Sequence, residues 1–199
     1  VIRKYPKQVL LAAGVRVAEN GGFYIFSVFM LLYATQHAHV ARTVVLDGVM
    51  IAAGVNFLAI PFFGALSDRL GRRPVYLFGA VMTAVLAFPL FWLFDTGSTA
   101  MVWLGLVLVF TFAHAPMYGP QAAFLAEMFG TRVRYSGASL GAQLASVVAG
   151  GLSPFIATAL MPKYGRVGLS LYLVGMAAVT IVSVLAATET VRKDIDEDS

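Results

Sequence analysis

The chain has 199 residues, of which 59% are hydrophobic and only 12% are charged, and its mean hydropathy is +0.82. An ordinary soluble domain carries about 25% charged residues, so this composition excludes one and indicates a membrane protein that lies in a lipid bilayer. The chain has no cysteine, which excludes disulfides and thiol-bound metals, and we expect neither a cofactor nor a metal site.

Six long apolar segments follow one another along the chain. Each is close to the roughly 20 residues that a helix rising 1.5 Å per residue needs to cross about 30 Å of hydrocarbon. The sequence therefore predicts an all-α integral membrane bundle of six transmembrane helices over residues 1–190, followed by a disordered cytoplasmic tail at 191–199. The six segments are residues 9–33, 44–63, 75–94, 101–118, 137–160 and 168–187.

The first segment carries charges at membrane depth. Arg16 and Glu19 lie three residues apart and thus on one helical face, which Asn20 and, one turn further, Tyr24 extend. A charge at this depth costs about 2.5–3.5 kcal/mol on insertion scales, so these side chains are expected to face the bundle interior or a water-filled cavity. A cation, a carboxylate, an amide and a phenol together predict a binding site for a small carboxylate or zwitterionic metabolite.

Glu19 is also the first candidate for proton coupling, because a substrate anion that engages Arg16 would release this carboxylate to bind a proton. The alternative is a structural ion pair that braces the first segment. His114 is the second candidate, since histidine changes charge near physiological pH, although a lone histidine is more often a packing residue. His114 is also a candidate for substrate binding, and the other such residues are Asn56, Tyr118, Gln121 and Gln143.

A tight basic loop with the sequence GALSDRLGRRP, residues 64–74, separates the second and third segments. A turn with three arginines and one aspartate between two membrane helices must lie at a membrane face. The pattern G-x-x-x-D-R-x-G-R-R resembles the signature loop of major facilitator superfamily transporters, which joins helices two and three of each six-helix half. The resemblance implies that the chain is half of a secondary transporter.

A second stretch, MYGPQAAFLAEMFGTRVRYSG at residues 117–137, is similar to the metabolite:proton symporter family within that superfamily. The RVAEN sequence at 16–20 and the segment at 137–160 resemble the same family, whose members carry shikimate, oxoglutarate, citrate, proline or betaine. The resemblance covers almost the whole chain but only the second half of a twelve-helix transporter. It implies proton-coupled symport by alternating access, with no enzymatic chemistry and with a missing amino-terminal half as partner.

Charged side chains at the ends of neighbouring helices are expected to latch one face of the transporter shut. In this hypothesis Asp68 and Glu127 pair with nearby arginines. The alternative is that these charges only set the membrane topology. The residues of the predicted gate are Gly64, Asp68, Arg69, Gly71, Arg72, Arg73, Glu127, Arg132 and Arg134.

Most lysines and arginines fall on the side of the predicted bundle that holds both termini and the signature loop. The positive-inside rule places that side in the cytoplasm, with the bundle in a plasma membrane, as in a bacterial inner membrane. This distribution accounts for the net charge of +4 without a nucleic-acid partner.

Two other functions fit parts of the sequence. Residues 137–141, GASLG, match the G-x-S-x-G pattern, so a rhomboid-like intramembrane serine protease would use Ser139 with His114 as its base. That motif requires a strand–turn–helix context, which is absent here, and His114 precedes the serine whereas rhomboid-type enzymes have it afterwards. The second alternative is a truncated membrane bundle that transports nothing.

Overall fold

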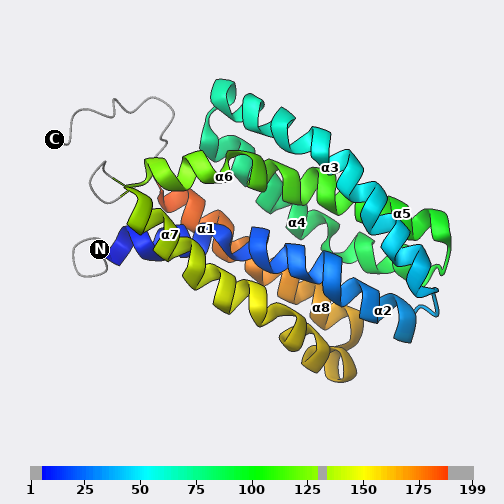
Figure 1. The fold of residues 1–199 in the computed structure, drawn as a ribbon. Coiled ribbons are helices and arrows are strands. Elements are labelled where there is room, and N and C mark those ends of the chain that lie inside the picture. Colours follow the sequence, from blue (N-terminus) through cyan, green and yellow to red (C-terminus); the bar gives the residue numbers. More distant parts are fainter. Residues whose placement is uncertain (1–5, 130–133, 188–199) are drawn as a thin grey trace.

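The computed structural model describes residues 6–129 and 134–187, and every regular element within these residues is helical. Five helical stretches are long and apolar enough to cross a membrane, and they lie side by side in one elongated bundle (Figure 1). The predicted all-α membrane bundle is therefore confirmed, whereas the predicted tail at 191–199 lies outside the described residues. The stretches are Pro6–Gln36, Arg42–Leu70, Arg72–Asp95, Thr99–Glu127 and Tyr135–Ala186.

Two predicted loops are reduced to single glycines. Helix α3 (Arg42–Leu70) continues through most of the loop expected at residues 64–74, and α4 (Arg72–Asp95) begins directly after Gly71, whose φ is 107°. Within α8 (Ser153–Ala186), Gly165 has φ 58° and ψ −157°, which marks a kink between two helices. Figure 1 shows the chain reversing its direction within α8. Glycine adopts positive φ without a Cβ clash. The last of the five stretches therefore contains both the fifth and the sixth predicted segment. The predicted number of six membrane helices is thus approximately correct for the described residues.

Three membrane stretches contain a π-helical turn, a feature that is frequent at functional sites. The first stretch is built from α1 (Pro6–Tyr24), η1 (Ile25–Phe29) and α2 (Met30–Gln36). The fourth is built from α5 (Thr99–Leu108), η2 (Val109–His114) and α6 (Ala115–Glu127). In the last, α7 (Arg134–Ala145) and η3 (Ser146–Gly151) precede α8.

Small residues stand where the helices approach most closely. A Cβ on Gly119 of α6 would lie 2.7 Å from the Ile60 carbonyl oxygen and 2.8 Å from the Gly64 nitrogen of α3. Close backbone contact of this kind is how membrane helices associate without a hydrophobic driving force. Helix α4 packs against α8 and α6 and buries Tyr76 and Phe91 completely.

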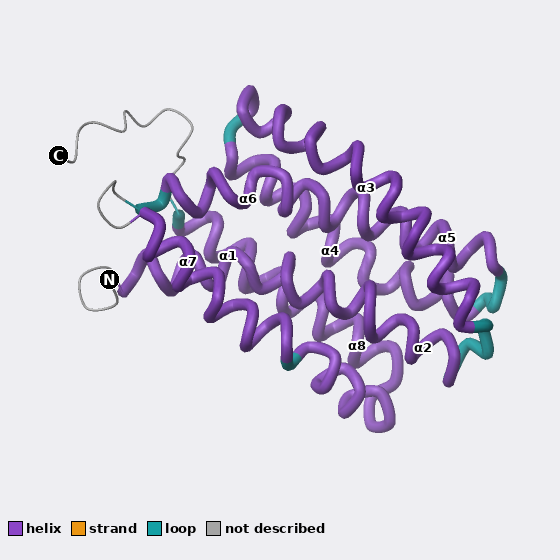
Figure 2. The backbone as a smooth tube through the Cα atoms, viewed as in Figure 1, coloured by secondary structure: helices purple, strands orange, loops and turns teal. Residues whose placement is uncertain are grey.

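The outer surface of the bundle is apolar, as contact with lipid requires. On α3, Met50, Phe57 and Leu58 are 71%, 78% and 71% exposed. The start of α1, the turn between α3 and α4, and the end of α8 lie at one end of the bundle, and the turn after α4 lies at the other (Figures 1 and 2). The signature loop thus shares one face with both ends of the described chain.

Candidate functional site

Glu19 of α1 is the centre of a buried polar cluster. The residue is 2% exposed, and its Oε2 accepts a hydrogen bond of 2.6 Å from Nε2 of Gln121 on α6. Nε of Arg16, one turn earlier on α1, lies 3.3 Å from the same oxygen. The structure therefore brings three predicted site residues together and compensates the buried carboxylate with a charge and an amide.

His114 joins this cluster from η2. Its Nε2 lies 3.5 Å from Oε1 of Glu19, and its Nδ1 lies 3.3 Å from Nδ2 of Asn56 on α3. The two ring nitrogens of His114 therefore contact residues of two different helices. The ring of Tyr118 stacks on the imidazole at 5.1 Å. His114 and Asn56 thus extend the cluster from α1 to α3.

Tyr76 of α4 belongs to the same cluster, although the sequence analysis did not select it. Its hydroxyl donates a 3.1 Å hydrogen bond to the carbonyl oxygen of Val15 and lies 3.4 Å from Nε2 of Gln121. In the sequence this tyrosine stands near the start of an apolar segment, where tyrosines are common as interfacial residues. No sequence signal therefore marked it as a member of the site.

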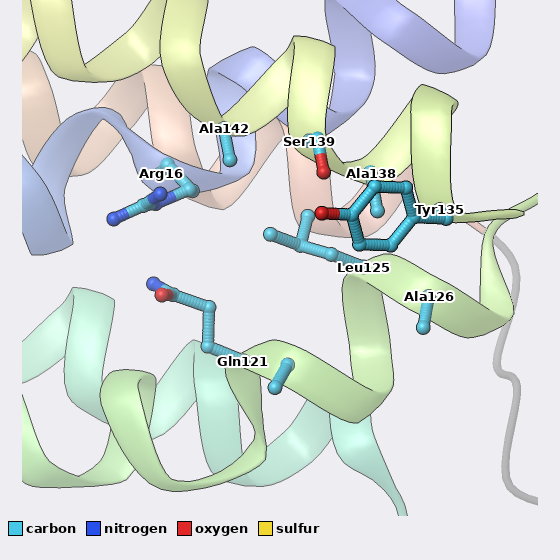
Figure 3. A pocket seen from close by; sticks show the side chains of 9 residues that line it. Arg16, Gln121, Leu125, Ala126, Tyr135, Ala138, Ser139 and Ala142 are labelled. Carbon is cyan, nitrogen blue, oxygen red and sulfur yellow. The ribbon is translucent and has the colours of Figure 1, made fainter.

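A pocket of about 600 Å³ adjoins the cluster between α1, α6 and α7 (Figure 3). Two predicted residues, Arg16 and Gln121, line one side of it, and Ser139 and Tyr135 of α7 line another. The other lining residues are apolar and mostly small: Ala122, Leu125, Ala126, Ala138 and Ala142. Space for a small ligand therefore lies next to the buried Arg16–Glu19 ion pair, and the guanidinium of Arg16 is part of its lining.

The remaining predicted binding residues are less closely connected. Asn20 is 9% exposed, and its Oδ1 has no hydrogen-bond partner among the described residues. Asn20 packs directly against Gly150 of η3, and a Cβ added to Gly150 would overlap with the Asn20 side chain. Tyr24 and Tyr118 are 39% and 48% exposed. Gln143 is exposed on α7 and does not join the Glu19 cluster in the described part of the chain.

The predicted gate contains a compact charge cluster at the end of the bundle that holds the signature loop. Arg72 at the start of α4 forms an ion pair with Asp68 of α3 and donates a hydrogen bond of 2.7 Å to Oγ of Ser67. Its Nη2 lies 3.5 Å from Oε1 of Glu127 on α6. Arg73 donates a hydrogen bond of 3.2 Å to the backbone carbonyl oxygen of Val184 on α8. Three helices are therefore joined through Arg72.

Other members of the predicted gate contribute differently. Arg69 is exposed, Gly71 forms the turn, and Gly64 provides the close contact with α6. Arg132 and the side chain of Arg134 lie outside the described residues. The pairing of Asp68 and Glu127 with Arg72 follows the predicted arrangement, while its role in gating stays a prediction.

A second charged cluster lies at the opposite end of the bundle. Asp95 at the end of α4 forms an ion pair with Arg166, directly after the kink at Gly165. The hydroxyl of Tyr33 on α2 donates a 2.5 Å hydrogen bond to Oδ1 of the same carboxylate. Asp95 and Arg166 lie far apart in the sequence, so only the folded structure reveals this cluster.

Comparisons with known proteins agree with this architecture. A family model described as "Sugar (and other) transporter" matches residues 3–198. The shikimate transporter of Escherichia coli K12 is 36% identical over 161 residues, which cover 81% of this chain and 37% of that protein. An inner membrane metabolite transport protein of the same organism is 31% identical over 197 residues, covering 96% of this chain and 44% of its own length.

The proline/betaine transporter of Escherichia coli K12 is 29% identical over 197 residues, covering 98% of this chain and 39% of that protein. All three relatives are transporters rather than enzymes. The chain spans less than half the length of these curated relatives.

Proposed function

This chain belongs to the sugar (and other) transporter family of the major facilitator superfamily, and from this premise we propose that it is the carboxyl-terminal half of a proton-coupled symporter. The substrate is a small polar or carboxylate metabolite, in keeping with relatives named for shikimate, for metabolites and for proline and betaine. An amino-terminal half completes the binding site, and rocking of the two halves alternates access to it.

The buried carboxylate of Glu19 carries this proposal. An ionisable group at membrane depth is costly and is retained mostly where it does chemical work. Glu19 contacts Arg16 and Gln121, both of which line the pocket, while the carboxylate itself lies behind the pocket wall. A change at the pocket is therefore transmitted to Glu19 through its own hydrogen-bond partners.

Proton and substrate are coupled through the positive charge of Arg16, which both carboxylates share. A substrate carboxylate that binds the Arg16 guanidinium weakens its contact with Glu19, and Glu19 then takes up a proton in place of the lost cation. His114 lies against the other oxygen of Glu19 and provides a second group through which the proton passes. Release of substrate and proton on the other side restores the ion pair.

The orientation follows from the basic residues near the signature loop. We place that end of the bundle and both termini in the cytoplasm by the positive-inside rule. The membrane is the inner membrane of a bacterium, as the name of one relative states for that protein. The Arg72 cluster then lies at the cytoplasmic face, where it holds α3, α4 and α6 together in the outward-open state.

The substitution Glu19→Gln tests the coupling. In the complete transporter we expect uptake driven by an acid exterior to be lost, because the amide cannot carry the proton, while counterflow exchange of substrate persists. Asp47→Asn is a matched control, since Asp47 is an exposed carboxylate on α3 away from the cluster. Intact uphill transport in the Glu19→Gln variant would contradict the proposal.

The same uptake assay distinguishes the proposed transporter from a truncated bundle. A truncated bundle without transport activity predicts no uptake even when the amino-terminal half is supplied. The protease alternative has no support from the relatives, and among the described residues His114 contacts Glu19, Asn56 and Tyr118 rather than Ser139.

A further inference from the structure

The pocket has an unused cationic edge on its α1 side. Arg16 contacts Glu19 through Nε, and no described residue accepts a hydrogen bond from its two terminal nitrogens. The side chain also lines the pocket (Figure 3). A guanidinium edge binds a carboxylate through two parallel, charge-assisted hydrogen bonds. This side of the pocket is therefore suited to one carboxylate of a ligand.

The α7 side of the pocket offers hydroxyl groups instead of charge. Ser139 and Tyr135 are four residues apart, so they share one face of α7, and both line the pocket (Figure 3). Neither hydroxyl is hydrogen-bonded within the described part of the chain. Gln121 across the pocket uses its amide nitrogen on Glu19, which leaves its carbonyl oxygen for another donor. Hydroxyl groups and an amide oxygen suit a ligand that carries hydroxyls.

The described part of the lining carries no carboxylate. Apart from the four polar residues, the described lining consists of four alanines and Leu125. Glu19 is not among the lining residues. Its side chain contacts Gln121 and Arg16, which separate it from the pocket. Ligand hydroxyls would find hydrogen-bond partners on this part of the pocket.

We infer that Ser139 and Tyr135 are specificity-determining residues, which bind hydroxyl groups of a substrate whose carboxylate is held by Arg16. The inference rests on the proposed function and narrows its substrate to a hydroxylated monocarboxylate.

The test is uptake of three probes by the complete transporter. Shikimate has a ring, hydroxyls and a carboxylate, cyclohex-1-ene-1-carboxylate has the same ring without hydroxyls, and glycine betaine is a zwitterion. In wild type we expect shikimate to be preferred over the other two. Ser139→Ala and Tyr135→Phe should each lower the preference for shikimate over the bare ring by about fivefold in kcat/KM, the value of one hydrogen bond. The control Ser136→Ala changes an exposed serine that is not among the lining residues of the pocket.

Uptake of shikimate and of the bare ring should be unchanged in Ser136→Ala, and an unchanged Tm in detergent shows that the Ser139→Ala and Tyr135→Phe proteins are folded. A shikimate preference that survives in the Ser139→Ala/Tyr135→Phe double variant would overturn the inference while the proposed function stands. Wild-type preference for glycine betaine would overturn it as well. If wild type takes up none of the three probes, the inference is overturned, whereas the proposed function is contradicted only if no other small polar or carboxylate metabolite is taken up either.

Discussion

Glu19 illustrates how a single charge is held inside an apolar bundle. Its two oxygens contact side chains from α1, α6 and η2, and Asn56 holds the imidazole of His114 from α3. A buried carboxylate that lost one of these partners would keep its desolvation cost without full compensation. The cluster is therefore sensitive to a ligand that competes for any one of its members.

Asp68 is a carboxylate of the charge cluster at the signature loop, where it pairs with Arg72. It is 62% exposed at the side chain, so its ion pair with Arg72 contributes no more than about 1 kcal/mol. Asp68→Asn should therefore favour opening of that face by about fivefold, a shift that follows from this free energy. Labelling of Ala142→Cys in the pocket by a maleimide applied from the cytoplasmic side measures the shift. An unchanged labelling rate would show that the cluster does not act as a latch.

The helices themselves were largely predictable from apolar runs, because lipid contact requires about 20 apolar residues. Their ends were not, since polar residues continue a helix beyond the hydrocarbon. Helix α3 runs past its apolar segment through Ser67 and Asp68 to the positive φ of Gly71. The spacing of Arg16 and Glu19 already placed them on one helical face, whereas Gln121 and His114 were selected as isolated polar residues. Their contacts with Glu19 depend on helix rotation, which sequence periodicity did not fix.

The contact between α3 and α6 gives a prediction for an element. In Gly119→Ala the new methyl group meets the backbone of Ile60 and Gly64 at less than 3 Å, so the helices must separate. We expect a loss of stability of about 1–3 kcal/mol, as for other overpacked sites, and a lower Tm of the purified protein in detergent. Gly54→Ala on α3 is the matched control, because a Cβ there meets no atom within 4 Å. Equal Tm values for the two variants would contradict this packing.

The whole molecule is an elongated bundle with one charged cluster at each end. Arg72 joins α3, α4 and α6 at one end, and Asp95 joins α2, α4 and α8 at the other. Helix α4 therefore takes part in both charged clusters. The sequence indicated the first cluster through its motif, but Asp95 and Arg166 carried no recognisable pattern. The second half of the binding site belongs to the proposed amino-terminal half.

Orientation is the property on which both the direction of proton-driven uptake and the position of the latch depend. The chain has no cysteine, so single cysteines report on it without background from this sequence. Arg69→Cys marks the signature loop and Thr96→Cys the opposite end, and both positions are exposed. With a membrane-impermeant maleimide on intact cells, we predict labelling of Thr96→Cys and none of Arg69→Cys until the cells are opened. Labelling of Arg69→Cys on intact cells would contradict the account.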